Sequence, residues 1–406
     1  MDIAIVGAGL AGLSAANELV RRGHQVTVFE AGDGPGGRVR TDRIDGHLVD
    51  RGFQILLEAY PYARSILDYR TLDLRKFAPG AMVRIEDGFH RIGDPLREPA
   101  RLLDTVRAPI GSPIDKARIL AFRRSVNRGS VTDIWDRPET TARQRLSDMG
   151  FSNRMIDRFL TPLFAGITLD PDLGGSSRVL EFVFRMLSAG DAAVPADGMG
   201  AISDQLADRL PAGALSLESP VDRVDAGSIT LAGGEKIKAD AVVVATGVTE
   251  AALLAEIEDR GWRGVTSLWL AADEPPIDEP VLVLNGAGTD PINSLVVMSQ
   301  VSDRYSPAGA STIVVSSPVL RAGLVEDMRT QLRSWFGPVA DSWRELRVDE
   351  IERAQPIQPV GLGPRGAYLT PNGVWICGDH TTDPSINGAL ASGQAVAREL
   401  STVRAA

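Results

Sequence analysis

The chain has 406 residues, of which 44% are hydrophobic and 24% are charged. This composition is typical of a folded globular protein and excludes disordered and fibrous classes, and the length suggests about two or three domains. The net charge of −10, without any block of Lys or Arg residues, argues against a nucleic-acid partner.

Cysteine content and the start of the chain bear on the cellular compartment. Cys377 is the only cysteine, which excludes a disulfide within the chain and a cysteine-rich metal site, and no metal is expected. Residues 1–6 lack the basic region of a secretory signal peptide. Apolar runs such as 241–245 have the length of a strand, whereas a membrane-spanning helix needs about 20 residues. The sequence therefore predicts a cytoplasmic protein.

The first predicted elements form a strand–turn–helix–strand unit. Residues 2–6 are an apolar, β-branched run that predicts a buried strand. A glycine-rich turn follows at 7–12, and residues 13–22 predict a helix that ends at Gly23. Residues 25–30 predict the second strand. The order of these elements is that of a dinucleotide-binding unit.

The glycines of this turn have separate physical tasks. Gly7 permits the tight turn, Gly9 lets the backbone approach a pyrophosphate, and Gly12 lets the helix pack close to the sheet. The start of the helix offers free N–H groups and a positive dipole to phosphates. Glu30, at the end of the second strand, can accept hydrogen bonds from ribose hydroxyls and disfavours the 2′-phosphate of NADP.

A second glycine pair favours FAD over NAD as the expected cofactor. Gly36, Gly37 and Arg38 follow shortly after Glu30. Glycines at this place let the backbone pass close to a ligand, and Arg38 can pair with a pyrophosphate. An NAD-only domain has no use for this second contact, so the segment favours FAD.

The remaining predicted elements follow in chain order. Ser112, Pro113 and Asp115 have the order of an N-cap, a first helical residue and a capping-box acid, and they predict a helix start. The other elements are helical residues 141–165, strand-like runs over 215–247 with a hairpin turn at 232–234, a helix at 320–336, a strand at 374–378 and a last helix at 387–401.

Three groups of residues, at the start, the middle and the end of the chain, carry a family resemblance. They are residues 6–12 with Glu30 and 36–38; residues 195–200, 219–221 and 242–247; and residues 374–379 and 384–389. In these motifs and in their order the chain resembles the FAD-dependent amine oxidase and phytoene desaturase superfamily.

The resemblance implies an α/β fold with a discontinuous, Rossmann-like FAD-binding domain and an α+β substrate domain, as in the amine oxidase and glutathione reductase type of architecture. It places the FAD domain at 1–75, 195–250 and 345–406. The substrate domain would take the two insertions, 76–194 and 251–344.

The resemblance also assigns roles to single residues. Val221 would offer its backbone to the adenine, and Asp379 would hydrogen-bond the ribityl chain. Ile386 and Ala389 would lie beside the pyrimidine edge of the flavin, and Gln54 near its ring. The full set of residues expected to bind FAD is Gly7, Ala8, Gly9, Gly12, Glu30, Ala31, Gly36, Gly37, Arg38, Gly52, Phe53, Gln54, Val221, Gly247, Gly378, Asp379, Ile386, Asn387 and Ala389.

Departures from typical amine oxidases favour another branch of the superfamily. Ser385 occupies the place where amine oxidases carry an aromatic residue beside the flavin, and no lysine follows Lys238. The stretches 49–61 and 379–385 resemble carotenoid and squalene desaturases more closely. Cys377 lies in a predicted strand, where a small buried side chain is expected, so the FAD is expected to be non-covalent.

The resulting expectation is an FAD-dependent oxidoreductase. It would desaturate or redox-isomerise an apolar, isoprenoid-like substrate by hydride transfer to flavin N5, with oxygen or a quinone as the electron acceptor. His380 is the best titratable candidate for a catalytic role, although a structural role in the ribityl loop is the alternative. The oligomeric state is left open.

Two other functions remain open from the sequence. One is an oxygen-dependent amine or protoporphyrinogen oxidase. The other is a non-catalytic lipid-binding protein, because escort proteins of small GTPases share this fold without flavin chemistry. The apolar stripe within 151–164 would serve either as core packing or as an access surface for a substrate held in a membrane, with peripheral membrane contact.

Overall fold

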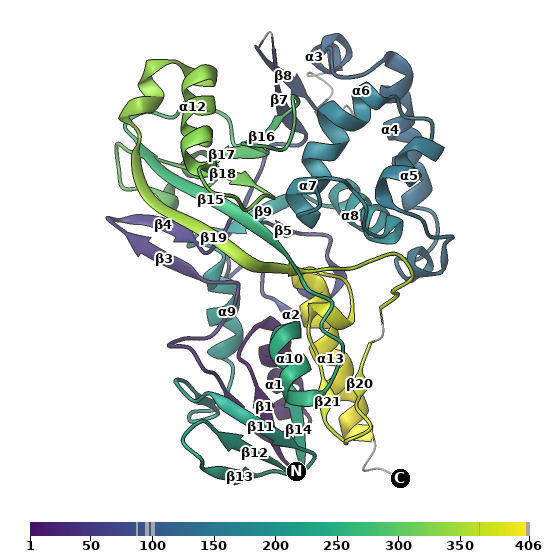
Figure 1. Ribbon diagram of the computed structural model, residues 1–406, viewed down its shortest axis with the longest axis vertical. Helices are drawn as coiled ribbons and strands as arrows, with labels where there is room; N and C mark the ends of the chain where they lie inside the picture. The colour runs from purple at the N-terminus through teal and green to yellow at the C-terminus, as the bar shows by residue number, and fades with distance from the viewer. Residues whose placement is uncertain (87, 94–96, 99–101, 365, 403–406) are drawn as a thin grey trace.

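Two lobes follow one another along the long axis of the molecule (Figure 1). The computed structural model describes residues 1–86, 88–93, 97, 98, 102–364 and 366–402. Within these residues the lower lobe is built on a six-stranded sheet, and the upper lobe combines a seven-stranded sheet with a group of helices. No helix in the described ranges is long and apolar enough to cross a bilayer.

The lower sheet has the strand order β10-β2-β1-β14-β21-β20. Its pairs are parallel except for β20 and β21. The strands are β1 (Asp2–Val6), β2 (Gln25–Phe29), β10 (Leu215–Ser216), β14 (Ala241–Val244), β20 (Tyr368–Leu369) and β21 (Trp375–Ile376). The predicted strands at 2–6 and 25–30 are thus confirmed, each ending within one residue of its expected end.

Two helices from opposite ends of the chain pack against each other beside this sheet (Figure 1). They are α1 (Leu10–Arg21) and α13 (Ile386–Thr402). A Cβ at Gly393 would overlap the Ala11 carbonyl, so the two helices meet at a glycine contact. Ser14 Oγ donates to the Leu390 carbonyl at 2.9 Å across the same contact. The start and the end of the chain therefore form one structural unit.

The upper sheet has the strand order β19-β15-β18-β17-β16-β7-β8. Its strands are β7 (Ala81–Ile85), β8 (Gly88–Ile92), β15 (Trp262–Ala272), β16 (Leu282–Asn285), β17 (Ser294–Val297), β18 (Ser311–Ser317) and β19 (Arg344–Pro356). Helix α12 (Leu324–Phe336) covers one face, burying Leu324, Met328 and Leu332. Leu320, expected in the same helical stripe, precedes the helix and is exposed.

A group of helices flanks the other end of this sheet (Figure 1). They are α3 (Leu102–Arg107), α4 (Pro113–Val126), η2 (Thr132–Asp136), α5 (Ala142–Asp148), α6 (Asn153–Met155), the π-helical turn η3 (Ile156–Leu160), α7 (Thr161–Thr168) and α8 (Ser177–Ala189). The capping box at Ser112 and Asp115 is present. The helical stretch expected at 141–165 is interrupted after α5, because the chain turns at Gly150.

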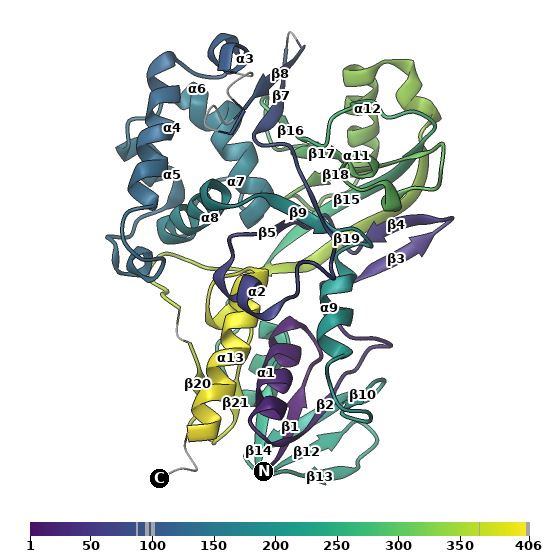
Figure 2. The same cartoon turned by 180° about the vertical axis from the view of Figure 1, so that it is seen from behind.

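The remaining elements are shorter and lie within either lobe or between the two. They are β3 (Thr41–Ile44), β4 (His47–Asp50), β5 (Leu56–Leu57), α2 (Pro61–Ile66), β6 (Leu74–Lys76), β9 (Ala192–Pro195), α9 (Gly200–Ala207), β11 (Val221–Asp225), β12 (Ser228–Leu231), β13 (Lys236–Lys238), α10 (Val248–Ala255), α11 (Met298–Val301), η4 (Asp303–Tyr305), η5 (Pro338–Ser342) and η6 (Asp379–Thr381). Figure 2 shows α9 running between the lobes on the back of the molecule. The hairpin expected at 232–234 connects β12 and β13.

The strands of the two sheets come from different segments of the chain. The lower sheet takes all its strands from 1–75, 195–250 and 345–406. Strand β19, at 344–356, pairs instead with β15 of the upper sheet. We propose the two expected domains as the units of this fold, with the last boundary moved from 345 to the end of β19.

Candidate functional site

A cavity of about 1250 Å³ runs from the glycine turn of the lower lobe to the helices of the upper lobe. Typical sites for one small ligand measure about 300–1,000 Å³, so the space suffices for more than one molecule. The expected site residues that line it are Gly7, Gly9, Glu30, Ala31, Gly36, Gly37, Arg38, Gly52, Phe53, Gln54, Val221, Gly247, Gly378, Asp379, Ile386 and Ala389. Those outside the lining are Ala8, Gly12, Asn387 and His380.

The glycine turn leaves open space where a ligand's phosphates would lie. A Cβ added at Gly9 would meet no atom within 4 Å, and Gly9 is the N-cap of α1. The first turn of α1 contains no acidic residue, so its free N–H groups and positive dipole face the cavity unopposed. A Cβ at Gly12, in contrast, would overlap the Gly7 carbonyl oxygen. Gly12 therefore serves helix packing, and Gly9 faces the cavity.

The carboxylate of Glu30 is held in place by backbone donors. Its Oε2 accepts a hydrogen bond from the Ala8 N–H at 2.7 Å, and its Oε1 accepts one from the Gly32 N–H at 2.9 Å. Each carboxylate oxygen has a further lone pair for a ligand hydroxyl. Ala8 thus positions Glu30 rather than lining the cavity itself.

Arg38 connects the beginning of the site with its end. Its Nη2 donates to Asp379 Oδ1 at 2.7 Å, and its Nη1 donates to the Ala354 carbonyl at 2.9 Å. The guanidinium also lies 5.2 Å from the centre of the Trp262 ring, within the range of a cation–π contact. The Asp379 side chain is 7% exposed and that of Arg38 is 38% exposed. The pair therefore presents a fixed, partly accessible cation at the cavity wall.

The segment around Gln54 closes the wall between the lobes. Gln54 Nε2 donates to the carbonyls of Arg38 at 2.7 Å and Arg51 at 3.2 Å. Gly52 and Phe53, on the same segment, line the cavity as expected. The amide of Gln54 is thereby committed to the backbone, so its role is to fix the loop that carries Arg38.

His380 lies outside this cavity, although its neighbours Gly378 and Asp379 line it. Its ring lines a separate small pocket with Arg260 and Leu362. Burial lowers the pKa of His380, and neither ring nitrogen has a hydrogen-bond partner among the described residues. The expectation of a catalytic His380 therefore finds no support in its position.

The start of α13 points at the cavity. Ile386 and Ala389 line it, and Ser385 Oγ accepts a hydrogen bond from the Gly388 N–H at 3.1 Å. Asn387 Oδ1 instead accepts the Tyr62 N–H at 3.0 Å, which fixes the start of α2. The positive end of this 17-residue helix is thus available to stabilise negative charge on a ligand.

The upper part of the cavity is called the apolar chamber here, for the side chains that α4, α6, η3, α7, α8 and the upper sheet contribute to it. They are Ile119, Leu120, Met155, Phe159, Leu163, Val179, Phe182, Val183, Leu187, Leu282 and Leu284. Lys116 also lines this part, but its Nζ donates to the carbonyls of Val106 and Ala108 at 2.7 and 2.9 Å. A ligand placed here would meet mainly hydrocarbon and aromatic surface.

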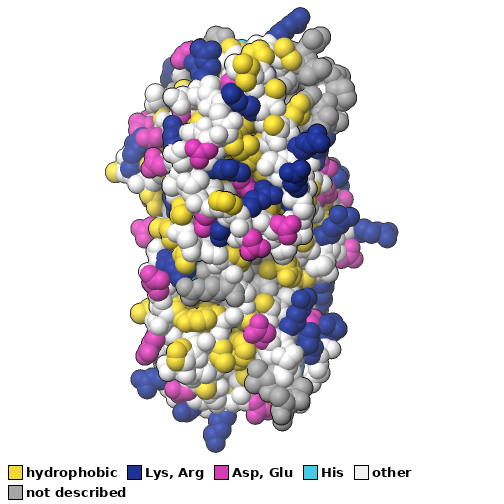
Figure 3. Space-filling view, turned by 90° about the vertical axis from the view of Figure 1, so that its right-hand side faces the viewer, with side chains coloured by type: hydrophobic (Ala, Val, Ile, Leu, Met, Phe, Trp, Pro, Cys, Tyr) yellow, Lys and Arg dark blue, Asp and Glu magenta, His cyan; other side chains and the backbone are white. Residues whose placement is uncertain are grey.

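The apolar stripe within 151–164 is divided between the core and this chamber. Phe151, Ile156 and Leu160 are buried in the core, while Met155 and Phe159 are buried and line the chamber. These five side chains are buried, and Leu163 of the same stripe is half-buried and also lines the cavity. Figure 3 shows the face that carries the upper helices, where hydrophobic and basic side chains mix. The exposed large apolar residues on α3 and α4 are Val106, Ile114 and Leu120.

A polar group at the lower end of the chamber was missed by the sequence reasoning. Asp383, Ser385 and Tyr60 all line the cavity, and Asp383 is 5% exposed. Ser385 Oγ donates a short hydrogen bond to Asp383 Oδ2. Burial raises the pKa of Asp383 to about 6. Burial, together with the nearby Asp383 carboxylate, raises the pKa of Tyr60 well above its usual range.

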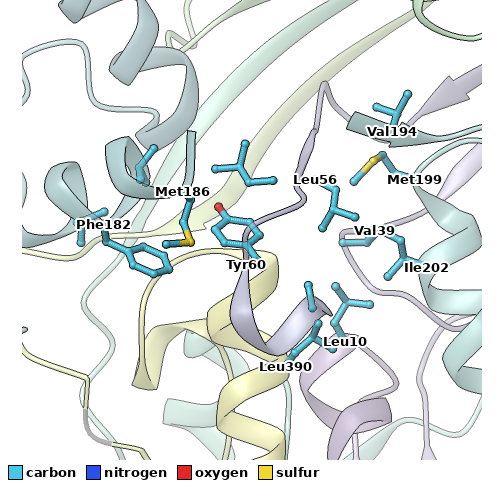
Figure 4. Close-up of a cluster of buried hydrophobic side chains, with 14 of the residues drawn as sticks. Leu10, Val39, Leu56, Tyr60, Phe182, Met186, Val194, Met199, Ile202 and Leu390 are labelled. Atoms are coloured by element: carbon cyan, nitrogen blue, oxygen red, sulfur yellow. The ribbon is translucent and has the colours of Figure 1, made fainter. Parts of the chain in front are cut away.

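Tyr60 reaches this group from a distant part of the chain. Figure 4 shows its ring beside Phe182 and Met186 of α8, above Leu390 of α13. The Tyr60 and Phe182 rings stack with their centres 5.9 Å apart. Only the folded chain brings Tyr60 to Asp383. The sole local signal was the Asp383-Pro384-Ser385 sequence before a helix, which is also typical of an ordinary helix cap.

The chain resembles a known protein family over most of its length. The family of flavin-containing amine oxidoreductases matches residues 10–401. Protoporphyrinogen oxidase 2 (chloroplastic/mitochondrial) of Arabidopsis thaliana is 31% identical over 176 residues, which are 42% of this chain and 33% of that protein. The 4,4′-diapophytoene desaturase of Staphylococcus haemolyticus is 47% identical over 57 residues, 14% of this chain and 11% of that protein. These matches span a third or less of the relatives' length.

Solved structures agree over nearly the whole chain. An oxidoreductase from Methanosarcina mazei has a TM-score of 0.76 and 18% identity, covering 98% of this chain and 100% of that one. Cyclohexylamine oxidase from Brevibacterium oxydans IH-35A has a TM-score of 0.73 and 18% identity, covering 100% and 99%. At this identity the likeness concerns the fold, and the expected fold class is confirmed.

Proposed function

Since the chain belongs to the family of flavin-containing amine oxidoreductases and is therefore an FAD-dependent oxidoreductase, we propose that it dehydrogenates or redox-isomerises an apolar, isoprenoid-like substrate. FAD in this role accepts a hydride at its N5 atom.

The lower part of the cavity fits a dinucleotide such as FAD. The open space at Gly9 and the N-terminus of α1 would take the pyrophosphate. Glu30 would accept the hydroxyls of the adenosine ribose, and Asp379 those of the ribityl chain. Cys377 is fully buried and does not line the cavity, which supports non-covalent binding.

The adenine and the pyrimidine edge have matching neighbours. Val221 and Gly247 line the cavity near Glu30, where the adenine would lie against backbone. Ile386 and Ala389 would lie beside the pyrimidine edge, where the positive end of α13 stabilises negative charge. These residues hold and polarise the cofactor, and the chamber above them holds the substrate.

The apolar chamber is the observation that carries the proposal for the substrate. Its walls along α4, η3, α7 and α8 are mainly apolar, and the guanidinium of Arg123, which also lines the cavity, donates to the Ser188 carbonyl at 2.9 Å. Lys116 is the lysine among the described lining residues, and two carbonyls occupy its Nζ. A hydrocarbon substrate loses nothing by entering such a chamber, whereas a charged one would lose its hydration.

An oxygen-dependent amine or protoporphyrinogen oxidase is the second candidate. One observation favours an amine: Asp383 is a carboxylate on the cavity wall without an ion-pair partner among the residues that the structure describes. Such a carboxylate could pair with a substrate ammonium group. The similarity to a protoporphyrinogen oxidase supports the porphyrinogen version.

Products distinguish these candidates. The FAD-loaded protein would be incubated with 4,4′-diapophytoene, protoporphyrinogen, cyclohexylamine or an L-amino acid, in air or with a quinone under argon. The proposal expects new double bonds in the isoprenoid. Release of peroxide with an amine or a porphyrinogen, and no reaction of the isoprenoid, would support the oxidase. A protein that stays colourless after FAD is added would indicate the lipid-binding alternative.

The same experiment identifies the electron acceptor and tests for contact with a membrane. Oxygen and a quinone are both proposed acceptors, and conversion of diapophytoene with only one of them identifies it. Val106, Ile114 and Leu120 on α3 and α4 are the exposed apolar residues near the chamber, so peripheral membrane contact is proposed through these helices. Faster conversion of vesicle-held diapophytoene than of detergent-held diapophytoene would support that contact.

A further inference from the structure

We infer that Asp383 is the proton acceptor of this enzyme: its carboxylate takes the proton that the substrate loses when a hydride passes to FAD. The inference rests on the proposed function and names the base that the sequence did not reveal. It deepens the same site rather than adding a second one.

Asp383 lies on the wall of the cavity, between the flavin neighbours and the chamber. It lies between η6 and α13, at the end of the chamber where the expected flavin neighbours Asp379 and Ile386 line the same cavity. Its side chain is buried, yet it contributes to the cavity wall. A base must be close enough to the substrate to receive a proton, and a wall position at the junction of the two parts meets that requirement.

Neutral side chains surround the Asp383 carboxylate. The Ser385 hydroxyl donates to its carboxylate, and the nearby Asn387 side chain also lowers its pKa. Both residues are fixed by further contacts, Ser385 with the Gly388 N–H and Asn387 with the Tyr62 N–H. The carboxylate is thus oriented by neutral groups that leave its charge unpaired.

The other carboxylates on the cavity wall already have ion-pair or hydrogen-bond partners. Asp379 pairs with Arg38 at 2.7 Å, and Asp349 with Arg347 at 2.8 Å. Asp191 pairs with Arg97 at 2.9 Å and also with Lys76. Glu250 pairs with Arg353, and Glu30 accepts two backbone N–H groups at the opposite end. Asp383 differs from them because it has no cationic partner among the described residues. Keeping a buried carboxylate ionised without a cation costs free energy, so such a group is expected where its protonation serves the reaction.

The charged and titratable groups around Asp383 support a base near neutrality. The pKa of Asp383 is raised to about 6; burial is the main cause, and the Asp379 carboxylate acts in the same direction. Ser385 and Asn387 act in the opposite direction. On the facing element, burial holds the pKa of Tyr60 well above its usual range, so this side chain stays a neutral phenol. A carboxylate with a pKa near 6 is mostly ionised at pH 7 and binds a proton more tightly than an ordinary carboxylate does.

The step balances in atoms and electrons. One substrate C–H bond breaks and its hydride, with two electrons, goes to FAD. The adjacent C–H bond breaks and its electron pair forms the new C=C bond, while the proton moves to Asp383. The carboxylate becomes a carboxylic acid and returns the proton to water when the product leaves.

The test compares FAD-loaded wild-type protein with Asp383→Asn and Asp383→Glu. Flavin absorbance is followed after anaerobic mixing with 4,4′-diapophytoene in detergent, between pH 5 and 8. Asp383→Asn should reduce the rate of bleaching at least about 100-fold at pH 7. The wild-type rate should increase as the pH passes through 6, and Asp383→Glu should restore part of the rate. Asp170→Asn removes a buried carboxylate outside the cavity and serves as the matched control.

Infrared spectroscopy gives a readout that needs no substrate. The wild-type protein with FAD should show a protonated carboxyl band that disappears as the pH increases through 6, and Asp383→Asn should lack this band. The visible FAD spectrum of all variants should stay that of the wild type, which separates proton transfer from cofactor loss.

Each outcome decides the matter. Equal bleaching rates and equal pH profiles in wild type and Asp383→Asn would overturn the inference and leave the proposed function intact. An increase in KM for cyclohexylamine with unchanged maximal bleaching would make Asp383 a binding group for amines, and would also overturn it. If diapophytoene bleaches no variant, the proposed function fails for this substrate. The infrared band then decides: titration near pH 6 supports Asp383 as a proton-accepting group, and a carboxylate ionised throughout excludes it.

Discussion

Arg38 donates a hydrogen bond to Asp379 at 2.7 Å, although the two residues lie 341 positions apart. The first comes from the loop after β2 and the second from the segment before α13. Their pairing is possible because β21, which precedes Asp379, lies beside β14, and β14 lies beside β1. The site is therefore assembled by parallel strands that collect distant parts of the chain at one edge of the sheet.

Removing Arg38 should weaken FAD binding. Arg38→Ala leaves the nearly buried Asp379 carboxylate without its cation and removes the contact with Trp262. Because Arg38 itself is partly exposed, solvent compensates part of the loss, and we expect FAD affinity to fall roughly 10- to 100-fold. Titration of the apoprotein with FAD, followed by flavin fluorescence, measures this effect. Arg43→Ala, which removes an exposed arginine on β3, should bind FAD like the wild type.

Alanine at Gly9 and at Gly12 should have different consequences. A Cβ at Gly9 meets no protein atom, so Gly9→Ala should unfold at the wild-type temperature when FAD is absent but should bind FAD at least about tenfold more weakly. A Cβ at Gly12 overlaps the Gly7 carbonyl, so Gly12→Ala should destabilise the protein with or without FAD. Thermal unfolding with and without FAD checks both. Equal behaviour of the two variants would show that Gly9 does not face the phosphates.

Stability should depend on pH through Asp383. The pKa of this carboxyl is raised from 3.8 to about 6 in the folded protein, so the folded state binds the proton more tightly than the unfolded state. Its contribution is therefore greatest below pH 4 and is lost as the pH increases through 6, by roughly 3 kcal/mol. Asp383→Asn removes this dependence. Urea unfolding at pH 4.5 and pH 7.5 should show the variant gaining stability relative to wild type only at the higher pH.

Filling the chamber should impair substrate turnover without affecting the cofactor. Val183 on α8 is buried and lines the chamber, so Val183→Phe would project into the space proposed for the substrate. We expect turnover of diapophytoene to fall at least about tenfold while FAD affinity stays unchanged. Val339→Phe adds the same volume at an exposed position and is the control. Unchanged turnover in Val183→Phe would place the substrate elsewhere.

The sequence predicted those parts of the site that depend on local spacing. Gly9, Glu30 and Arg38 lie within one continuous stretch, where each residue type has a physical reason for its place. The structure adds their partners, such as Ala8 for Glu30.

Other features depend on contacts between distant segments, which spacing alone does not reveal. Tyr60 and Asp383 meet only because α2 packs against α13. His380 follows Asp379 directly, yet the turn η6 directs its ring to a different pocket. The length of β19 carries it out of the expected FAD segment and into the upper sheet. In each case tertiary packing decides, because a residue's neighbours along the chain do not fix the direction of its side chain.

The most direct test of the account is the reduction and reoxidation of the flavin in the purified protein. The FAD-loaded protein would be reduced anaerobically, exposed to air and then given a quinone, while the visible flavin absorbance is recorded. We predict a flavin band that disappears on reduction and returns when an electron acceptor, oxygen or the quinone, is supplied. A reduced flavin that neither acceptor reoxidises would contradict both proposed acceptors, and a protein with no flavin band after addition of FAD would contradict the assignment of an FAD-dependent enzyme as a whole.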